Sequence, residues 1–165
     1  MAEPRYVLDA NVFIEAARRY YAFDLAPRFW HSLTDHAGTG RICSIDRVKD
    51  ELVRGKDELA DWAKTEFSHG FCSTDENEVV ESLSEMMEWV QRQKQFTDFA
   101  KAEFASVADG WIVAYASVNR LIVVTHEEFA PDVKKKVPIP NVCNEFGVKY
   151  TDTFEMLRVL KVQFR

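Results

Sequence analysis

The stretch Tyr6–Ile14, which reads YVLDANVFI, decides the fold because a single acidic residue separates a short apolar strand from a helix. That residue is Asp9. An acidic side chain that ends a buried strand and opens a helix faces the crevice beyond the strand's carboxyl edge. Open α/β sheets bind their ligands in that crevice. Asp9 is therefore the first candidate for a functional carboxylate.

Strands and helices alternate along the remaining chain. The clearest strand begins at Leu121 with the run LIVVT. Apolar and polar residues do not alternate in this run, as expected of a parallel strand covered on both faces. Strands are expected at 7–9, 41–45, 70–72, 121–125 and 148–150. Helices are expected at 11–22, from Pro27 to the break at Gly38, and at 46–54, 57–68, 96–105, 109–118 and 153–160. Strands separated by helices imply βαβ units and a mainly parallel sheet.

Two further expectations concern the second half of the chain. Ser73 and Glu76 have the spacing of a capping box before a longer helix. The apolar stripe of that helix is expected to include Val79, Val80, Leu83, Met86, Met87 and Val90. The segment from Lys134 to Pro140 is expected to form a loop.

The composition is that of a globular protein, with 165 residues of which 47% are hydrophobic. This length fits a single domain over residues 1–165. No apolar run approaches the ~20 residues of a membrane span, and the N-terminal residues lack the features of a signal peptide, so a cytoplasmic location is expected. The net charge of −6 argues mildly against a broad electrostatic grip on nucleic acid. An acid cluster that binds metal would itself contribute such negative charge.

Three more acids stand at places comparable to that of Asp9. Glu51 lies within an expected helix, Asp109 starts another, and Glu127 follows the apolar run at 121–125. Four carboxylates from distant parts of the chain indicate a divalent-metal site, because Mg²⁺ and Mn²⁺ prefer oxygen ligands.

Each of these acids has a simpler interpretation. Asp9 could only cap the helix that follows it, and Asp109 could only favour a helix start through the helix dipole. The remaining two acids have rivals nearby: Asp46 and Asp50 for Glu51, and Glu128 for Glu127.

Four short motifs resemble those of the PIN-domain ribonucleases. They are Leu8–Val12, Glu51–Leu52, Ala108–Ala114 and Val123–Glu127, and they occur in the order of that family over nearly the whole chain. The resemblance looks closest to a subfamily of bacterial and archaeal PIN proteins of unassigned function. That subfamily is similar to toxin ribonucleases of the VapC type.

The resemblance implies a three-layer α/β/α fold, with a five-stranded parallel sheet in the order 3-2-1-4-5 and helices on both faces. It also implies an endoribonuclease that depends on Mg²⁺ or Mn²⁺. Carried over by position, the catalytic and metal-binding residues are Asp9, Glu51, Asp109 and Glu127, supported by the polar residues Asn11 and Thr125. The commoner family motif has aspartate where this chain has Glu127, which leaves open whether one or two metals bind.

The resemblance further implies partners. These are an RNA substrate, a protein antitoxin of a type II pair whose tail blocks the acid crevice, and a second copy of the chain in a homodimer. The possible RNA contacts are Arg18, Arg54, Lys134 and Lys135.

Two other functions fit part of the pattern. A PIN-like module that binds without catalysis stays open because Glu127 replaces the usual aspartate. A haloacid-dehalogenase-like phosphatase would also place Asp9 after its first strand and Thr125 after a later one. That family normally has a second aspartate where this chain has Asn11.

Overall fold

Five parallel strands form the centre of the protein, for which a computed structural model describes residues 3–164. The strands lie in the order β3-β2-β1-β4-β5, which confirms the expected order. Their bounds are β1 (Tyr6–Leu8), β2 (Ile42–Ile45), β3 (Phe71–Cys72), β4 (Ile122–Val124) and β5 (Tyr150–Thr151). Since β1 is the middle strand, the residue that follows it lies at the centre of the sheet's carboxyl edge.

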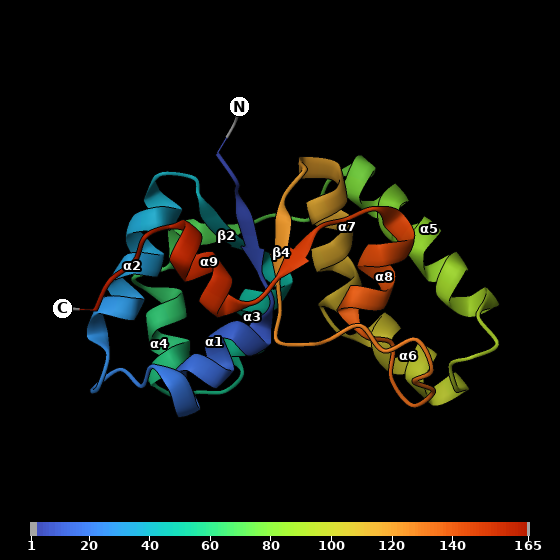
Figure 1. Ribbon diagram of the computed structural model, residues 1–165, viewed down its shortest axis with the longest axis horizontal. Coiled ribbons are helices and arrows are strands. Elements are labelled where there is room, and N and C mark those ends of the chain that lie inside the picture. Colours follow the sequence, from blue (N-terminus) through green and yellow to red (C-terminus); the bar gives the residue numbers. More distant parts are fainter. Residues whose placement is uncertain (1–2, 165) are drawn as a thin grey trace.

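Helices cover both faces of this sheet, as Figure 1 shows. One side carries α1 (Ala10–Glu15), α2 (Pro27–Gly38), α4 (Glu58–Lys64) and α9 (Thr153–Val159). The other side carries α5 (Asn77–Arg92), α6 (Asp98–Ser106), α7 (Asp109–Asn119) and α8 (Ile139–Phe146). The remaining helix, α3 (Asp46–Val53), packs against α1 and α4. None of the helices in the described residues is long and apolar enough to cross a membrane.

The core lies between the sheet and its two helical layers. The central strands are buried on both faces, and Val7, Leu8, Val123 and Val124 are completely inaccessible to solvent. On the side of α1, a cluster of rings fills the space between helices, with Phe13 5.6 Å from Phe67 between ring centroids. Burial of such aromatic side chains is a large stabilising contribution. The core therefore holds β1 and β4 firmly beneath the carboxyl edge.

The first helix is shorter than expected. It ends at Glu15 and continues as a π-helical turn, η1 (Ala16–Tyr20). The N–H of Tyr21 donates to the carbonyl of Ala16, five residues back, at 2.8 Å. This wider turn replaces the regular helix predicted to run to residue 22. Turns of this kind are frequent at functional sites.

The predicted capping box before α5 is wrong. The residue before the helix is Glu76, which makes no side-chain capping bond, and the Ser73 hydroxyl instead accepts from the N–H of Asp75 at 3.1 Å. The buried stripe of α5 is also narrower than the predicted apolar stripe, because Val79 is buried whereas Val80 is 43% exposed. The helix starts later and turns one member of the stripe outward.

The predicted loop ends earlier than expected, because α8 begins at Ile139. Pro140 lies in its first turn, where the missing N–H of proline removes no hydrogen bond. The helix ends at Gly147, whose φ of 68° is left-handed and suits glycine. Strand β5 consequently starts at Tyr150 rather than at residue 148.

Helix α7 approaches α5 and α6 closely at Gly110. A Cβ atom at this position would lie 2.8 Å from Cε of Met87 and 3.2 Å from Cε1 of Phe104. The missing side chain thus lets the first turn of α7 pack against its neighbours. Asp109 lies in that turn.

Replacing Gly110 with valine should lower the free energy of unfolding by about 1–3 kcal/mol, because extra methyl groups overpack this contact. Urea denaturation would measure the loss. The matched control is Gly38→Val at the end of α2, where an added Cβ meets nothing within 4 Å. Equal losses in the two variants would contradict the close packing assigned to Gly110.

Candidate active site at the carboxyl edge of the sheet

Asp9 is a buried carboxylate at the centre of the carboxyl edge. It is 1% exposed, and its N–H donates to the carbonyl of Val124 at 3.0 Å, which continues the pairing of β1 with β4. The hydroxyl of Thr125 donates to Oδ2 of Asp9 at 3.3 Å. Within the described residues, the Asp9 side chain makes no capping bond to α1. Helix capping therefore does not account for this acid.

The three other predicted acids lie close enough to act on Asp9. Burial raises the pKa of Asp9 well above its ordinary value, and the charges of Asp109, Glu127 and Glu51 raise it further. Burial also raises the pKa of Asp109 to about 7, with further contributions from Glu127 and Glu51. Like charges that raise one another's pKa must be near neighbours. The charges of Asp109, Glu127 and Glu51 thus act on Asp9 at the carboxyl edge of the sheet, and this place is called the acid crevice below.

Glu127 is held by contacts to the chain that follows it. Its Oε1 accepts from the N–H of Ile139, at the start of α8, at 2.9 Å. Its Oε2 lies 2.9 Å from Nζ of Lys136. The backbone N–H of Glu127 donates to the hydroxyl of Thr125 at 3.1 Å, so Thr125 links Asp9 to this segment. Glu128, the rival for the fourth acid, is exposed.

The structure also separates Glu51 from its two rivals on α3. The carboxylate of Asp46 accepts from the N–H and the hydroxyl of Thr74 at 3.1 and 2.8 Å. Asp46 therefore ties the start of α3 to the segment after β3. Asp50 is exposed, whereas the charge of Glu51 acts on both Asp9 and Asp109. Of the polar residues expected to support the site, Thr125 is buried against Asp9, and Asn11 lies exposed in the first turn of α1.

Basic side chains lie beside Glu51. Arg54 and Arg47 help to line a cavity of about 290 Å³ that also contains Glu51 and Trp111. The guanidinium of Arg47 lies 3.7 Å from the ring centroid of Trp111. Sequence reasoning missed Arg47, although it lies four residues before Glu51 and hence on the same face of α3.

Other predicted RNA contacts lie on exposed segments. Arg18 is exposed on η1, and Lys134 and Lys135 are exposed on the loop before α8. The third lysine of that run, Lys136, contacts Glu127 instead. No local sequence pattern predicts this ion pair, because Lys136 lies nine residues after Glu127 and reaches it only through the path of the loop.

Aromatic rings gather beside Glu127. The ring of His126 lies 5.9 Å from that of Tyr20 and 6.2 Å from that of Phe154, between centroids. Tyr20 is 51% exposed at the end of the π-helical turn. The Nε2 atom of His126 is 3.1 Å from the hydroxyl of Thr153. His126 and Phe154 also line a cavity of about 520 Å³ that includes Glu127.

In the present side-chain arrangement, no three His, Cys, Asp or Glu residues among residues 3–164 form a group that could hold a metal ion. Both oxygens of Glu127 already have partners, namely Ile139 and Lys136. The four carboxylates thus share a crevice without surrounding one point.

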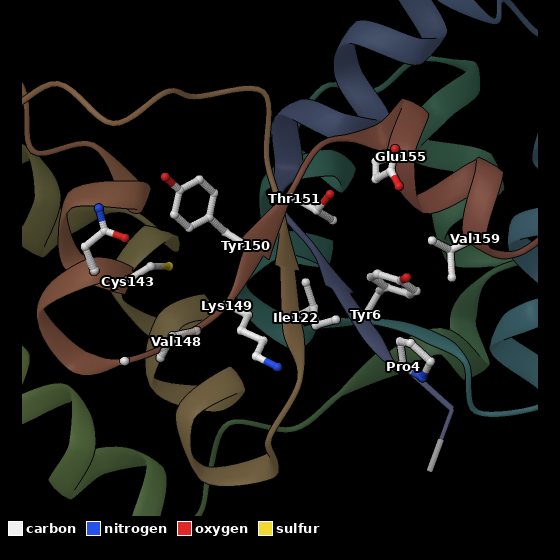
Figure 2. A pocket seen from close by; sticks show the side chains of 12 residues that line it. Pro4, Tyr6, Ile122, Cys143, Val148, Lys149, Tyr150, Thr151, Glu155 and Val159 are labelled. Atoms are coloured by element: carbon white, nitrogen blue, oxygen red, sulfur yellow. The ribbon is translucent and has the colours of Figure 1, made fainter. Parts of the chain in front are cut away.

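A separate hollow of about 590 Å³ lies beside β5 (Figure 2). Tyr6, Ile122 and Lys149 line it from the strands and the segment before β5, and Glu155 lines it from α9. Among the described residues that line it, none is one of the four predicted acids. The four predicted acids therefore lie outside this hollow.

Comparison with known proteins places the chain in a family. Residues 6–164 match the family described as "Domain of unknown function (DUF4411)", and the chain belongs to it. A search of curated proteins found no match.

Solved structures share the fold. A chain in the crystal structure of VapBC2 from Rickettsia felis, bound to a DNA fragment from their promoter, matches with a TM-score of 0.54 and 14% identity. The match covers 89% of this protein and 97% of that chain. A chain in the crystal structure of FitAcB from Neisseria gonorrhoeae matches with a TM-score of 0.51 and 17% identity, covering 88% and 95%. These similarities confirm the expected PIN-like α/β fold.

The raised pKa of Asp109 predicts how stability depends on pH without metal. The folded protein keeps the Asp109 proton to about pH 7, whereas the unfolded chain loses it near the ordinary value of 3.8. Folding therefore binds a proton between these values, and this contribution to stability falls as the pH rises from about 4 to 7. A shift of this size corresponds to an upper limit on the order of 4 kcal/mol.

Calorimetric melting in EDTA would test this for the wild type and Asp109→Asn. Asparagine cannot ionise, so the variant should melt progressively higher than the wild type as the pH rises from 5 to 7.5. Two parallel curves would show that Asp109 has no raised pKa.

Proposed function

We propose that this protein is a metal-dependent endoribonuclease that hydrolyses RNA phosphodiester bonds. One observation carries the proposal: the buried carboxylate of Asp9 lies at the carboxyl edge of a parallel sheet, under the charges of Asp109, Glu127 and Glu51. The motif resemblance to PIN-domain ribonucleases supports it. The PIN-like fold supports it independently of the motifs.

The four carboxylates fit Mg²⁺ or Mn²⁺ by their chemistry. They offer only oxygen ligands, which these hard cations prefer. Burial and mutual repulsion raise the pKa of Asp9 and Asp109, and a cation would relieve this repulsion. The residues that would hold it, once their side chains turn toward one point, are Asp9, Asp109, Glu51 and Glu127. A divalent cation, when bound, supplies Lewis-acid activation for attack by water on a phosphodiester.

Neighbouring residues would orient the acids and the substrate. The Thr125 hydroxyl restrains Asp9 by its hydrogen bond. Arg54 and Arg47 lie beside Glu51 and offer guanidinium groups for the RNA backbone, which arginine binds well. Arg18, Lys134 and Lys135 remain further candidates for such contacts on the exposed surface.

The exposed rings favour single-stranded or loop RNA over a duplex. Tyr20, His126 and Phe154 gather beside Glu127 and Thr125, where unpaired bases could stack on them. Sequence-tolerant recognition of single strands commonly uses such stacking. Bases inside a duplex cannot reach these rings.

Hydrolysis by water predicts the ends of the products. The water oxygen forms the new bond to phosphorus, the bond from phosphorus to the 3′ oxygen breaks, and the 3′ oxygen takes up a proton. The products therefore carry 5′-phosphate and 3′-hydroxyl ends. A 2′-hydroxyl attack would leave a cyclic phosphate instead.

Asp9→Asn should reduce RNA cleavage more than about 100-fold with little change in fold, because losing even an outer partner of a metal site costs 10- to 100-fold. The matched control is Asp50→Asn, which neutralises an exposed acid on α3 next to Glu51. End-labelled single-stranded RNA with Mn²⁺ gives rates and end groups. Cleavage that continues in excess EDTA, or full activity in Asp9→Asn, would refute the mechanism.

We further propose that the chain is the toxin of a type II pair and acts in the cytoplasm. The resemblance to VapC-type toxins implies a protein antitoxin. An arginine of its tail would complement the four carboxylates of the crevice. The similarity to chains from the VapBC2 and FitAcB structures supports this at the level of the fold. A homodimer is proposed on the same resemblance.

Expression in the native host tests the toxin role. The wild type alone should arrest growth, and the product of the adjacent gene should bind it and restore growth. Asp9→Asn is the control and should be harmless alone while still binding that partner. If the lone wild type is harmless and binds no such product, the toxin role fails and the nuclease remains.

A further inference from the structure

A lysine ammonium reaches into the acid crevice. The Nζ atom of Lys136 lies 2.9 Å from Oε2 of Glu127, whose side chain is only 13% exposed, while that of Lys136 is 51% exposed. Burial alone would lower the pKa of Lys136, but the charges of Glu127, Asp109 and Asp9 outweigh it and raise that pKa. The ammonium thus lies in the field of three of the four acids.

The loop segments on both sides of Lys136 are fixed by contacts with the rest of the protein. On one side of Lys136, the carbonyl of Lys134 accepts from Thr97 N–H at 2.9 Å, and that of Val133 accepts from Nε2 of Gln95 at 2.7 Å. On the other side, Val137 is buried and leads into α8. Because both flanks are anchored, the position of Lys136 is set by the fold. The adjacent Lys134 and Lys135 are exposed.

The ion pair also occupies a carboxylate oxygen of Glu127, one of the proposed metal ligands. Glu127 uses Oε2 for Lys136 and Oε1 for the N–H of Ile139. A divalent cation that is to bind Glu127 must therefore compete with the ammonium. Lys136 also acts on Asp109 directly, because its charge works against the rise of the Asp109 pKa.

We propose that Lys136 is the resident counter-cation of the acid site: it neutralises the carboxylates when no metal is bound and competes with the divalent cation for Glu127. This rests on the proposed metal site. Lys136 then keeps the metal-free protein stable at the expense of metal affinity. A lysine that only anchors the loop would have the opposite effect on metal binding, because its loss would loosen the site and weaken binding.

The test compares Lys136→Met with two control variants. Lys135→Met removes the same charge one residue away, and Lys136→Arg retains the charge. Metal-free proteins are titrated with Mn²⁺ alone, and free Mn²⁺ is read by electron paramagnetic resonance. Lys136→Met should bind Mn²⁺ about tenfold more tightly than the wild type, since a neighbouring positive charge and a competitor are both removed. The other two variants should stay within about threefold.

Melting in EDTA at neutral pH provides a second reading that needs no metal. Lys136→Met should melt below Lys135→Met, and saturating Mn²⁺ should remove this difference. Unchanged or weaker Mn²⁺ binding by Lys136→Met would overturn the inference and leave the proposed function standing. If no form of the protein binds Mn²⁺, the proposed metal site fails. Equal melting of the two variants in EDTA would then overturn the counter-cation role as well.

Discussion

The pairing of β1 with β4 is the interaction on which the rest of the structure depends. It extends one residue beyond the strand, through the hydrogen bond from Asp9 N–H to the carbonyl of Val124. The central strand lies between two helical layers, so the residue after it cannot turn to bulk solvent. A carboxylate is therefore buried at the centre of the sheet edge, where every neighbouring charge acts strongly on it.

The surrounding structure accommodates that buried charge by several partial means. Thr125 donates a hydrogen bond to Asp9, the N–H at the start of α8 is directed at Glu127, and the ammonium of Lys136 lies against the same carboxylate. These contacts do not neutralise the cluster, because the pKa of Asp9 and of Asp109 stays raised. Buried acids with raised pKa values at the edge of a sheet are candidates for a functional site.

The surroundings of Glu51 and of Glu127 differ in chemical character. Guanidinium groups and Trp111 lie beside Glu51, whereas Tyr20, His126 and Phe154 lie beside Glu127. Under the proposed function, the first side would contact phosphates and the second would stack on bases. The π-helical turn contributes to this difference, because it ends the first helix at Tyr20 and leaves that ring exposed.

Much of the fold follows from local pattern. The apolar runs at β1 and β4, the breaks at glycine and the helical stripes predicted where strands and helices lie along the chain, except α8. The spatial order of the strands was instead implied by the resemblance to PIN-domain ribonucleases. Helix α8 was not predicted because its start contains Pro138 and Pro140, and proline is compatible both with a loop and with a first helical turn. Asp9 and Glu127 were readable as neighbours because each follows a strand, and parallel strands bring their carboxyl ends to one edge. Glu51, within α3, was selected by the resemblance to PIN-domain ribonucleases.

The contacts of those acids could not be read from sequence, because they join residues from separate elements whose side chains meet only after packing. From the sequence, Asp46 and Asp50 are as suitable as Glu51 for the acid site. In the structure, Asp46 accepts a hydrogen bond from Thr74, and Asp50 is exposed to solvent. Lys134, Lys135 and Lys136 are chemically identical. All three are exposed, and only the anchored path of their loop directs Lys136 at Glu127. Element order is a property of local periodicity, whereas the charge balance of the site depends on distances that tertiary packing alone sets.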